Sequence, residues 1–147
     1  MADGKGTNSA VKLNSSDPDA YAGLATALLW SGDVETSVKD FETAAKLGLN
    51  FTANESFILG IAYLLSGRNA DAIRALEPSL DRNKTDPYIR AILAAAYAEA
   101  GRQDDAARQA REVRTIDPRF DSADFGSLLR KPDLRARLAA ALDKAGL

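Results

Sequence analysis

The hydrophobic positions along this chain of 147 residues recur with a fixed period. Three short phrases with the same order of large and small residues end in glycine, at Gly32, Gly67 and Gly101. These glycines are spaced by 35 and then by 34 residues. A period of this length indicates a repeat architecture, in which each copy buries its apolar face against its neighbours.

Each copy predicts two helices, one on either side of its glycine. Before the glycine, Leu59 and Tyr63 in the second copy and Leu93 and Tyr97 in the third are four residues apart, on one helical face. After the glycine a second stripe follows, formed by Val38 and Phe41, by Ala72, Ile73 and Leu76, and by Ala106, Ala107 and Ala110. Small residues recur directly after a leucine at Ala25, Gly60 and Ala94, where we expect two helix backbones to approach closely.

The boundaries of these helices are marked as well. Asp17, Asp86 and Asp117 each precede a proline, and a capping carboxylate before proline suits the first turn of a helix. The glycine between the two helices can take the left-handed conformation that ends a helix sharply. The sequence therefore predicts helical hairpins over residues 18–52, 53–86 and 87–120.

This pattern resembles the tetratricopeptide repeat (TPR). The resemblance is carried by Leu59-Gly60, Tyr63, Gly67, Ala72 and Leu76, by Leu93-Ala94, Tyr97, Gly101, Ala106 and Pro118, and more loosely by Leu24-Ala25, Gly32, Phe41 and Ala44. It implies an all-α fold, a right-handed solenoid of three helical hairpins. It also implies a protein–protein interaction module, in which the first helix of each hairpin lines a concave surface.

Both ends depart from the repeat. Residues 1–17 are either a short N-terminal arm or the remnant of a preceding repeat, since residues 10–17 align with Ala44-Ala-Lys-Leu-Gly-Leu. The second interpretation would make the chain part of a longer protein. Residues 121–147 predict capping helices: Phe125, Leu128 and Leu129 would be buried by a short helix, and Pro132 opens a final one.

The C-terminal segment is also similar to the tails of bacterial TPR proteins that carry an upstream class III adenylate/guanylate cyclase domain. The similarity rests on Asp117-Pro118-Arg-Phe120, Pro132-Asp133-Leu134 and Leu142-Asp-Lys144-Ala-Gly-Leu147. It implies a larger bacterial signalling or regulatory protein.

Two residue types that are common in catalytic sites are missing, because the chain contains no cysteine and no histidine. Thiolate chemistry, Ser-His-Asp catalysis and metal sites built on sulfur or imidazole are excluded. Asp104 and Asp105 lie at a predicted helix start, where carboxylates favour the positive end of the helix dipole. We predict no enzymatic activity, no cofactor and no metal.

The overall charge also limits the class of partner. The formal net charge is −2, so no basic field favours nucleic acid or a membrane surface. The N-terminus lacks the apolar stretch of a signal peptide, and no apolar run approaches the roughly 18 residues of a membrane span. We expect a cytoplasmic protein.

The predicted concave groove is mostly apolar. It would be lined by Ala22, Thr26, Trp30, Phe57, Ile61, Leu65, Tyr88, Ile92, Ala95 and Glu99. Such a groove suits a partner helix or an extended apolar peptide, with Trp30, Phe57 and Tyr88 as anchors. The alternative is that some of these residues are core; for Leu29 and Leu64 both interpretations stay open.

Two further hypotheses follow from the sequence. Apolar surface around Val11, Leu13 and Leu24 could pair with the end of another copy and form a homo-oligomer. Arg108, Arg111 and Arg114 form a basic ridge that either contacts an acidic partner or phosphate or is simply a solvated face.

Overall fold

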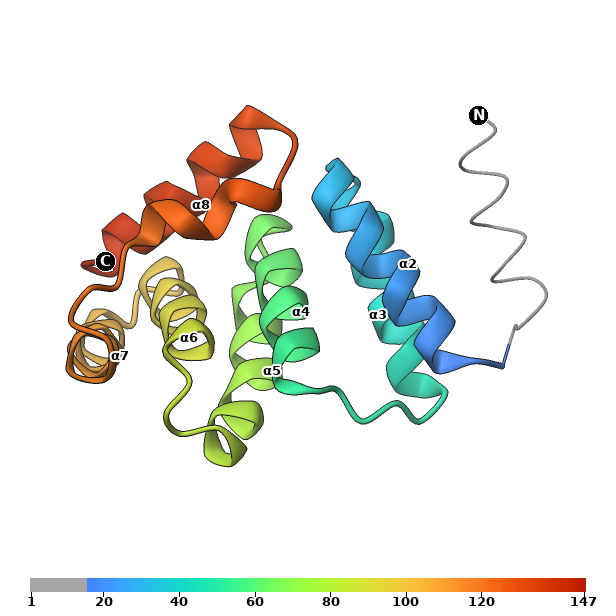
Figure 1. Cartoon of the computed structure of the whole chain (residues 1–147), viewed down its shortest axis with the longest axis horizontal. Helices are drawn as coiled ribbons and strands as arrows, with labels where there is room; N and C mark the ends of the chain where they lie inside the picture. Colours follow the sequence, from blue (N-terminus) through green and yellow to red (C-terminus); the bar gives the residue numbers. More distant parts are fainter. Residues whose placement is uncertain (1–15) are drawn as a thin grey trace.

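The computed structural model of the chain describes residues 16–147, and these residues form helices without strands (Figure 1). The helices are α2 (Pro18–Ser31), α3 (Val34–Lys46), α4 (Ala53–Leu65), α5 (Asn69–Arg82), α6 (Pro87–Glu99), α7 (Gln103–Ile116), the 3-10 helix η1 (Ser122–Leu128) and α8 (Pro132–Lys144). The predicted all-α fold of three helical hairpins is confirmed. The segment 1–15, with Val11 and Leu13, lies outside the described residues.

Polar caps begin most of the helices, as the sequence predicted for two of them. The Asp17 carboxylate accepts a hydrogen bond from the backbone N–H of Asp19, and the Asp86 carboxylate accepts from two N–H groups at the start of α6. Helix α4 begins with a reciprocal capping box between Thr52 and Glu55. The same prediction for Asp117 is wrong, because its carboxylate accepts from the Arg119 N–H in a turn and no helix follows directly.

Glycine ends the first helix of each hairpin. Gly67 has φ +79°, and the N–H of Arg68 then donates to the carbonyl of Tyr63 at 2.9 Å, which closes the turn. Gly60 serves a different purpose within α4. A Cβ atom at this position would lie 2.9 Å from the side chain of Leu76, so any larger residue would force Leu76 of α5 to shift. The predicted role of the small residue is confirmed here.

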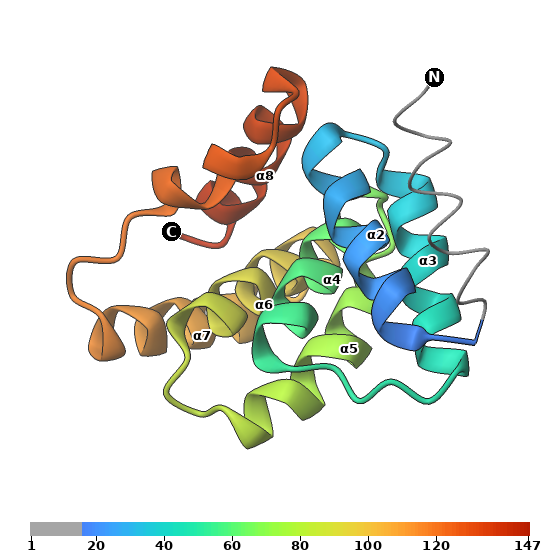
Figure 2. The same cartoon turned by 45° about the vertical axis from the view of Figure 1, so that its right-hand side comes forward.

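The hairpins stack in chain order, with α4 in contact with both α2 and α6 (Figures 1 and 2). Helices α2, α4 and α6 form the inner layer, and α3, α5 and α7 form the outer layer. The core runs through the stack from Leu29 and Phe41 to Val113. Helix α6 is enclosed almost completely, because residues 91–98 are all buried.

The C-terminal segment folds back over the inner layer. Helix α8 packs mainly against α6, η1 and α4, and Figure 1 shows it lying across one end of α4 and α6. We expected this segment to cap the end of the solenoid. The outer side of α7 offers no apolar surface for such a cap, since Arg108, Arg111 and Glu112 are exposed there. The inner faces of α4 and α6 are apolar, so α8 covers them instead.

Basic residues fix the path of this segment. The Lys131 ammonium lies 3.5 Å from the carbonyl of Gly32, after α2, and Arg137 donates to the carbonyl of Leu65 at 2.6 Å, at the end of α4. Lys144 pairs with Glu99 at 3.7 Å, at the end of α6. Cations stabilise the carboxyl ends of helices, where the dipole is negative. The segment therefore crosses the ends of three successive inner helices with one cation at each.

Candidate functional site

The inner face is buried over α4 and α6. Ile61, Ile92 and Ala95 are fully inaccessible, and Leu65 is nearly so. Helix α8 contributes its own buried residues to the same hydrophobic core, namely Leu134, Leu138, Ala141 and Leu142. Ala22 on α2 is buried too, so five of the ten predicted groove residues are core residues. Leu29 and Leu64, for which two interpretations were open, are also buried.

One part of the inner face stays open, and three of the predicted groove aromatics meet there. Trp30 and Phe57 are half-buried, while Tyr88 is 50% exposed. Phe125 of η1 packs edge-to-face on Phe57 with ring centroids 5.5 Å apart, and its ring lies 5.4 Å from that of Tyr88. A cavity of about 480 Å³ lies among these side chains and Leu128, which is 61% exposed. We call this cavity the aromatic pocket.

The aromatic pocket is acidic at its edge. Asp86 and Asp124 are among its lining residues, and no lysine or arginine is. One carboxylate oxygen of Asp86 already accepts from the backbone N–H groups of Tyr88 and Ile89. The surroundings of the cavity therefore combine apolar rings with negative charge.

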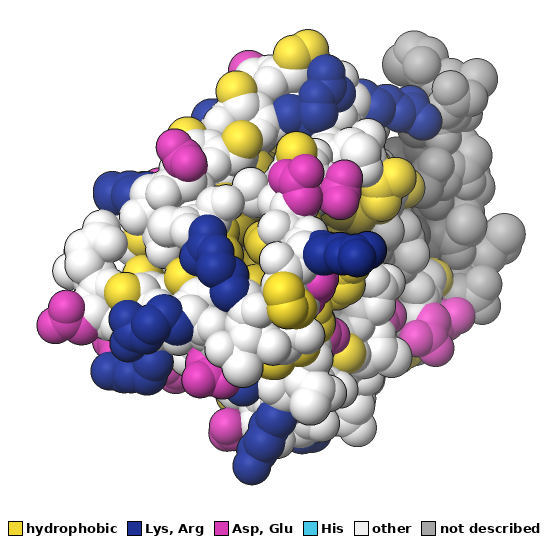
Figure 3. Space-filling view, turned by 60° about the vertical axis from the view of Figure 1, so that its left-hand side comes forward, with side chains coloured by type: hydrophobic (Ala, Val, Ile, Leu, Met, Phe, Trp, Pro, Cys, Tyr) yellow, Lys and Arg dark blue, Asp and Glu magenta, His cyan; other side chains and the backbone are white. Residues whose placement is uncertain are grey.

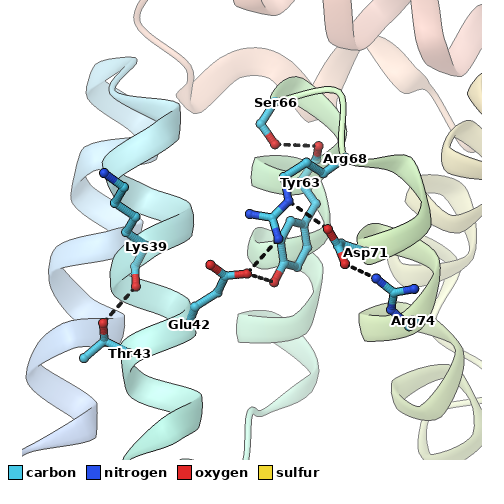
Figure 4. A network of polar contacts seen from close by, with 8 residues as sticks. All are labelled: Lys39, Glu42, Thr43, Tyr63, Ser66, Arg68, Asp71 and Arg74. Carbon is cyan, nitrogen blue, oxygen red and sulfur yellow. Dashed lines mark hydrogen bonds and ion pairs between the residues drawn. The ribbon is translucent and has the colours of Figure 1, made fainter.

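A polar network joins the first hairpin to the second (Figure 4). The Tyr63 hydroxyl donates to Glu42 of the neighbouring hairpin at 2.9 Å, and Arg68 donates to the same oxygen at 2.9 Å. The Arg68 guanidinium also lies 4.9 Å from the centre of the Tyr63 ring. Asp71 accepts from both Arg68 and Arg74. We call this set of contacts the inter-repeat network.

The environment of the network shifts the pKa values of Tyr63 and Asp71 in opposite directions. Burial raises the pKa of Tyr63, and the hydrogen bond to the Glu42 carboxylate raises it further. Burial alone would raise the pKa of Asp71, but the hydrogen bonds from Arg68 and Arg74 outweigh burial and lower it. The tyrosine therefore stays protonated and the aspartate charged, which suits a structural joint.

The same network recurs between the second hairpin and the third. Tyr97 donates to Glu77, and the Arg102 guanidinium lies 4.5 Å from the centre of the Tyr97 ring. Asp105 pairs with Arg102 at 2.9 Å and with Arg108 at 2.8 Å. Each member of the network recurs 34 residues later in the sequence, except the glutamate, which recurs 35 residues later. Because the pattern lies partly on charged surface positions, we did not predict it from the apolar stripe.

A second cavity, of about 690 Å³, lies at the first interface. Phe41 and Leu59 form its buried apolar floor, and half-buried Leu49 and Phe51 flank it. Exposed Arg82 also lines it. We call it the inter-repeat cavity, and the sequence analysis did not predict it.

Small side chains open this cavity. Three lining positions are small where the repeat places large residues at the second interface: Ala45 corresponds to Leu80, Ser56 to Arg90, and Ala75 to Gln109. At the second interface Arg90 donates to the side chain of Gln109 at 2.8 Å and fills the equivalent space. A comparison of aligned positions in successive repeats could have predicted this cavity from the sequence.

The remaining predicted site residues lie apart. Thr26 is half-buried, and its hydroxyl donates to the Ala22 carbonyl; Glu99 is paired with Lys144. Arg108, Arg111 and Arg114 are exposed on α7, as the basic ridge predicted. Arg108 is neutralised by Asp105, and Arg114 donates to the carbonyl of Gly146. Figure 3 shows one face of the molecule, on which hydrophobic side chains lie between charged side chains of both signs.

Within residues 16–147 no three acidic side chains gather in a way that could hold a metal ion. Among the described helices none is both long and apolar enough to cross a membrane.

The fold is that of known TPR solenoids. YrrB, described as a TPR protein with an unusual peptide-binding site, superposes with a TM-score of 0.71 at 24% identity, over 95% of this chain and 72% of that one. MamA superposes with a TM-score of 0.72 at 19% identity, over 95% and 82%. The MamA RS-1 ArsTM double mutant gives 0.71 at 20% identity, over 95% and 79%. No protein-family model and no curated protein matches the sequence. The resemblance to cyclase-bearing proteins is not tested by these comparisons and stays a prediction.

Proposed function

We propose that this chain is a protein-interaction module whose aromatic pocket binds a short peptide segment of a partner, with an apolar side chain next to a basic residue. The observation that supports this most is the exposure of Tyr88 and Leu128 around an apolar cavity of about 480 Å³. Elsewhere the inner face over α4 and α6 is buried. Large exposed apolar side chains around a pocket are typical of interaction sites.

The chemistry of the partner follows from the lining of the pocket. Phe57, Tyr88 and Phe125 offer ring faces and edges to an apolar side chain, and aromatic residues supply much of the binding energy at such sites. The carboxylates of Asp86 and Asp124 favour a lysine or arginine beside it. A long amphipathic helix along the groove, which the sequence also allowed, would meet α8.

A pair of dipeptide probes tests the proposal. We expect acetyl-Phe-Lys-amide to shift the backbone amide signals of Phe57, Tyr88 and Phe125 in the full chain, measured by heteronuclear NMR. Acetyl-Phe-Glu-amide should bind about fivefold more weakly, because it loses one exposed charge pair.

Two variants provide the control. Tyr88→Ala should reduce the affinity of acetyl-Phe-Lys-amide about tenfold, because truncating an aromatic anchor commonly costs more than 1 kcal/mol. Leu47→Ala truncates another exposed hydrophobic side chain that does not line the pocket, and should leave the affinity unchanged. Equal binding of both probes, or an unaffected Tyr88→Ala variant, would rule the proposed site out.

A further inference from the structure

We propose that the inter-repeat cavity is a second binding site, which takes a partner segment with a large apolar side chain next to a carboxylate. This site differs from the aromatic pocket in position and in charge. It lies between α3, α4 and α5 at the junction of the first two hairpins.

The volume and floor of the cavity suit an apolar group. About 690 Å³ lies within the range of roughly 300–1,000 Å³ that is typical of pockets for bound molecules. Phe41 and Phe51 stand edge-to-face with ring centroids 5.9 Å apart, and Leu59 adds a buried aliphatic surface. Phe51 is half-buried, so one of its faces is available to an incoming side chain.

The charges that line the cavity balance, with Glu42 and Asp71 against Arg74 and Arg82, but the unpaired one among these described residues is the cation Arg82. Both carboxylates that line it are engaged, since Glu42 accepts from Tyr63 and Arg68 and Asp71 accepts from Arg68 and Arg74. Arg82 also lines the cavity, and no ion pair joins it to another described residue. A guanidinium beside an apolar floor matches a carboxylate attached to an apolar side chain.

The second interface shows that the fold does not require this cavity. There the equivalent positions carry Leu80, Arg90 and Gln109, and the hydrogen bond from Arg90 to Gln109 bridges the gap. The same inter-repeat network holds both junctions together. The cavity is therefore a property of three small residues at one junction, and not a consequence of stacking hairpins.

The two sites lie on different sides of α4. Ser56, Leu59 and Tyr63 face the inter-repeat cavity, whereas Phe57 faces the aromatic pocket. At 100° per residue Phe57 points about 100–160° away from these three positions. Helix α8 does not line the inter-repeat cavity, so binding there does not require its displacement. One partner segment can occupy each site independently.

The test uses two probes that differ only in charge. N-acetylphenylalanine carries the carboxylate, and N-acetylphenylalanine amide is its neutral twin. We expect the acid to shift the backbone amide signals of Asn50, Phe51, Ala75 and Arg82 in the full chain. The acid should bind about fivefold more tightly than the amide, as for one exposed charge pair. Shifts confined to Tyr88 and Phe125 would assign the probe to the aromatic pocket and overturn the second site.

Matched variants separate the two parts of the proposal. The double variant Ala45→Leu, Ala75→Gln introduces the residues that the second interface carries, and should abolish the shifts from both probes. Arg82→Gln changes only an exposed side chain, and should reduce the affinity of the acid to that of the amide. Ala107→Gln on the exposed side of α7 is the control and should change neither. Binding that survives the double variant, or an acid no tighter than its amide, would overturn the inference.

Discussion

The two junctions between hairpins carry the same polar network and differ in how completely they close. At the first, Tyr63 reaches back to Glu42; at the second, Tyr97 reaches back to Glu77. Yet the first leaves a cavity of about 690 Å³, while at the second α5 and α6 pack closely. The network thus sets the register of stacking, whereas the size of the surrounding side chains sets how tightly the hairpins meet.

This difference shows how a repeat protein can gain a site without changing its fold. Ala45, Ser56 and Ala75 keep the helical pattern of their positions, because each is compatible with a helix or its first turns. These small side chains only reduce the volume that is filled at the first junction, where the inter-repeat network already holds the two hairpins together.

The largest difference is expected from Leu93→Ala and Leu59→Ala, which occupy the same position in successive repeats. Leu93 is enclosed at the tight junction, and its truncation should lower the free energy of unfolding by about 3–5 kcal/mol. Leu59 borders the open cavity, so its truncation should cost about 2 kcal/mol, since water can enter the enlarged space. Urea unfolding measures both. A greater loss for Leu59→Ala would contradict the comparison.

Removing one hydroxyl from the network comes next. Tyr97→Phe and Tyr63→Phe each delete a hydrogen bond to a carboxylate, and each should cost about 1–2 kcal/mol. Because the network is the shared feature, we expect similar losses at the two junctions. Urea unfolding at neutral pH checks this, and a loss at only one junction would show that the networks are not equivalent.

Alkaline pH gives an independent check on these tyrosines. Burial and the neighbouring glutamate raise the pKa of Tyr63 and of Tyr97 above the ordinary value of about 10. Above that value the unfolded chain loses the phenolic protons first, so the folded state becomes less stable as pH rises. Stability measured between about pH 9.5 and pH 11 should therefore fall less steeply in each Tyr→Phe variant than in the unmodified chain. Identical slopes would mean that these hydroxyls are not held as described.

Filling the cavity should have a smaller effect of opposite sign. Ala45→Leu with Ala75→Gln should raise the free energy of unfolding by about 0.5–1 kcal/mol, as cavity-filling changes commonly do. The control is the reverse change at the second junction, Leu80→Ala with Gln109→Ala, which should destabilise the chain. Thermal unfolding of the two double variants gives the sign directly.

The smallest effect is expected at the exposed arginines that complete each network. Arg74 and Arg108 pair with Asp71 and Asp105 three residues earlier on the same helix. Exposed pairs of this kind contribute little to stability. Arg74→Ala and Arg108→Ala should leave the urea midpoint almost unchanged, and a clear shift in either would show that the pair is coupled to the rest of its network.

The sequence predicted the repeat well because local signals carry it. Gly67 and Asp86 each act at a single turn or helix start, and the four-residue spacing from Leu59 to Tyr63 acts within a single helix. Asp117 shows that an Asp-Pro pair alone does not predict the start of a helix. It has the same pair as Asp86, but the residues that follow it lack a helical apolar stripe.

The candidate site was predicted only in part, for a related reason. Trp30, Phe57 and Tyr88 were identified as inner-face aromatics, and they do meet at the aromatic pocket. Ile61 and Ile92 carry the same helical signal, but α8 packs on α4 and α6 from far along the chain, and no local pattern encodes that contact. The inter-repeat cavity depends on which side chains are missing between two hairpins, which single-helix periodicity does not measure.

Helix α8 also bears on how the chain responds to load. In a solenoid whose units touch only their neighbours, the stack can stretch like a spring or fray one unit at a time. Here Lys131, Arg137 and Lys144 fasten one segment to the ends of α2, α4 and α6. Extension of the stack would have to break these attachments together with the core under α8. We therefore expect the core under α8, more than these exposed contacts, to resist extension of the inner helices.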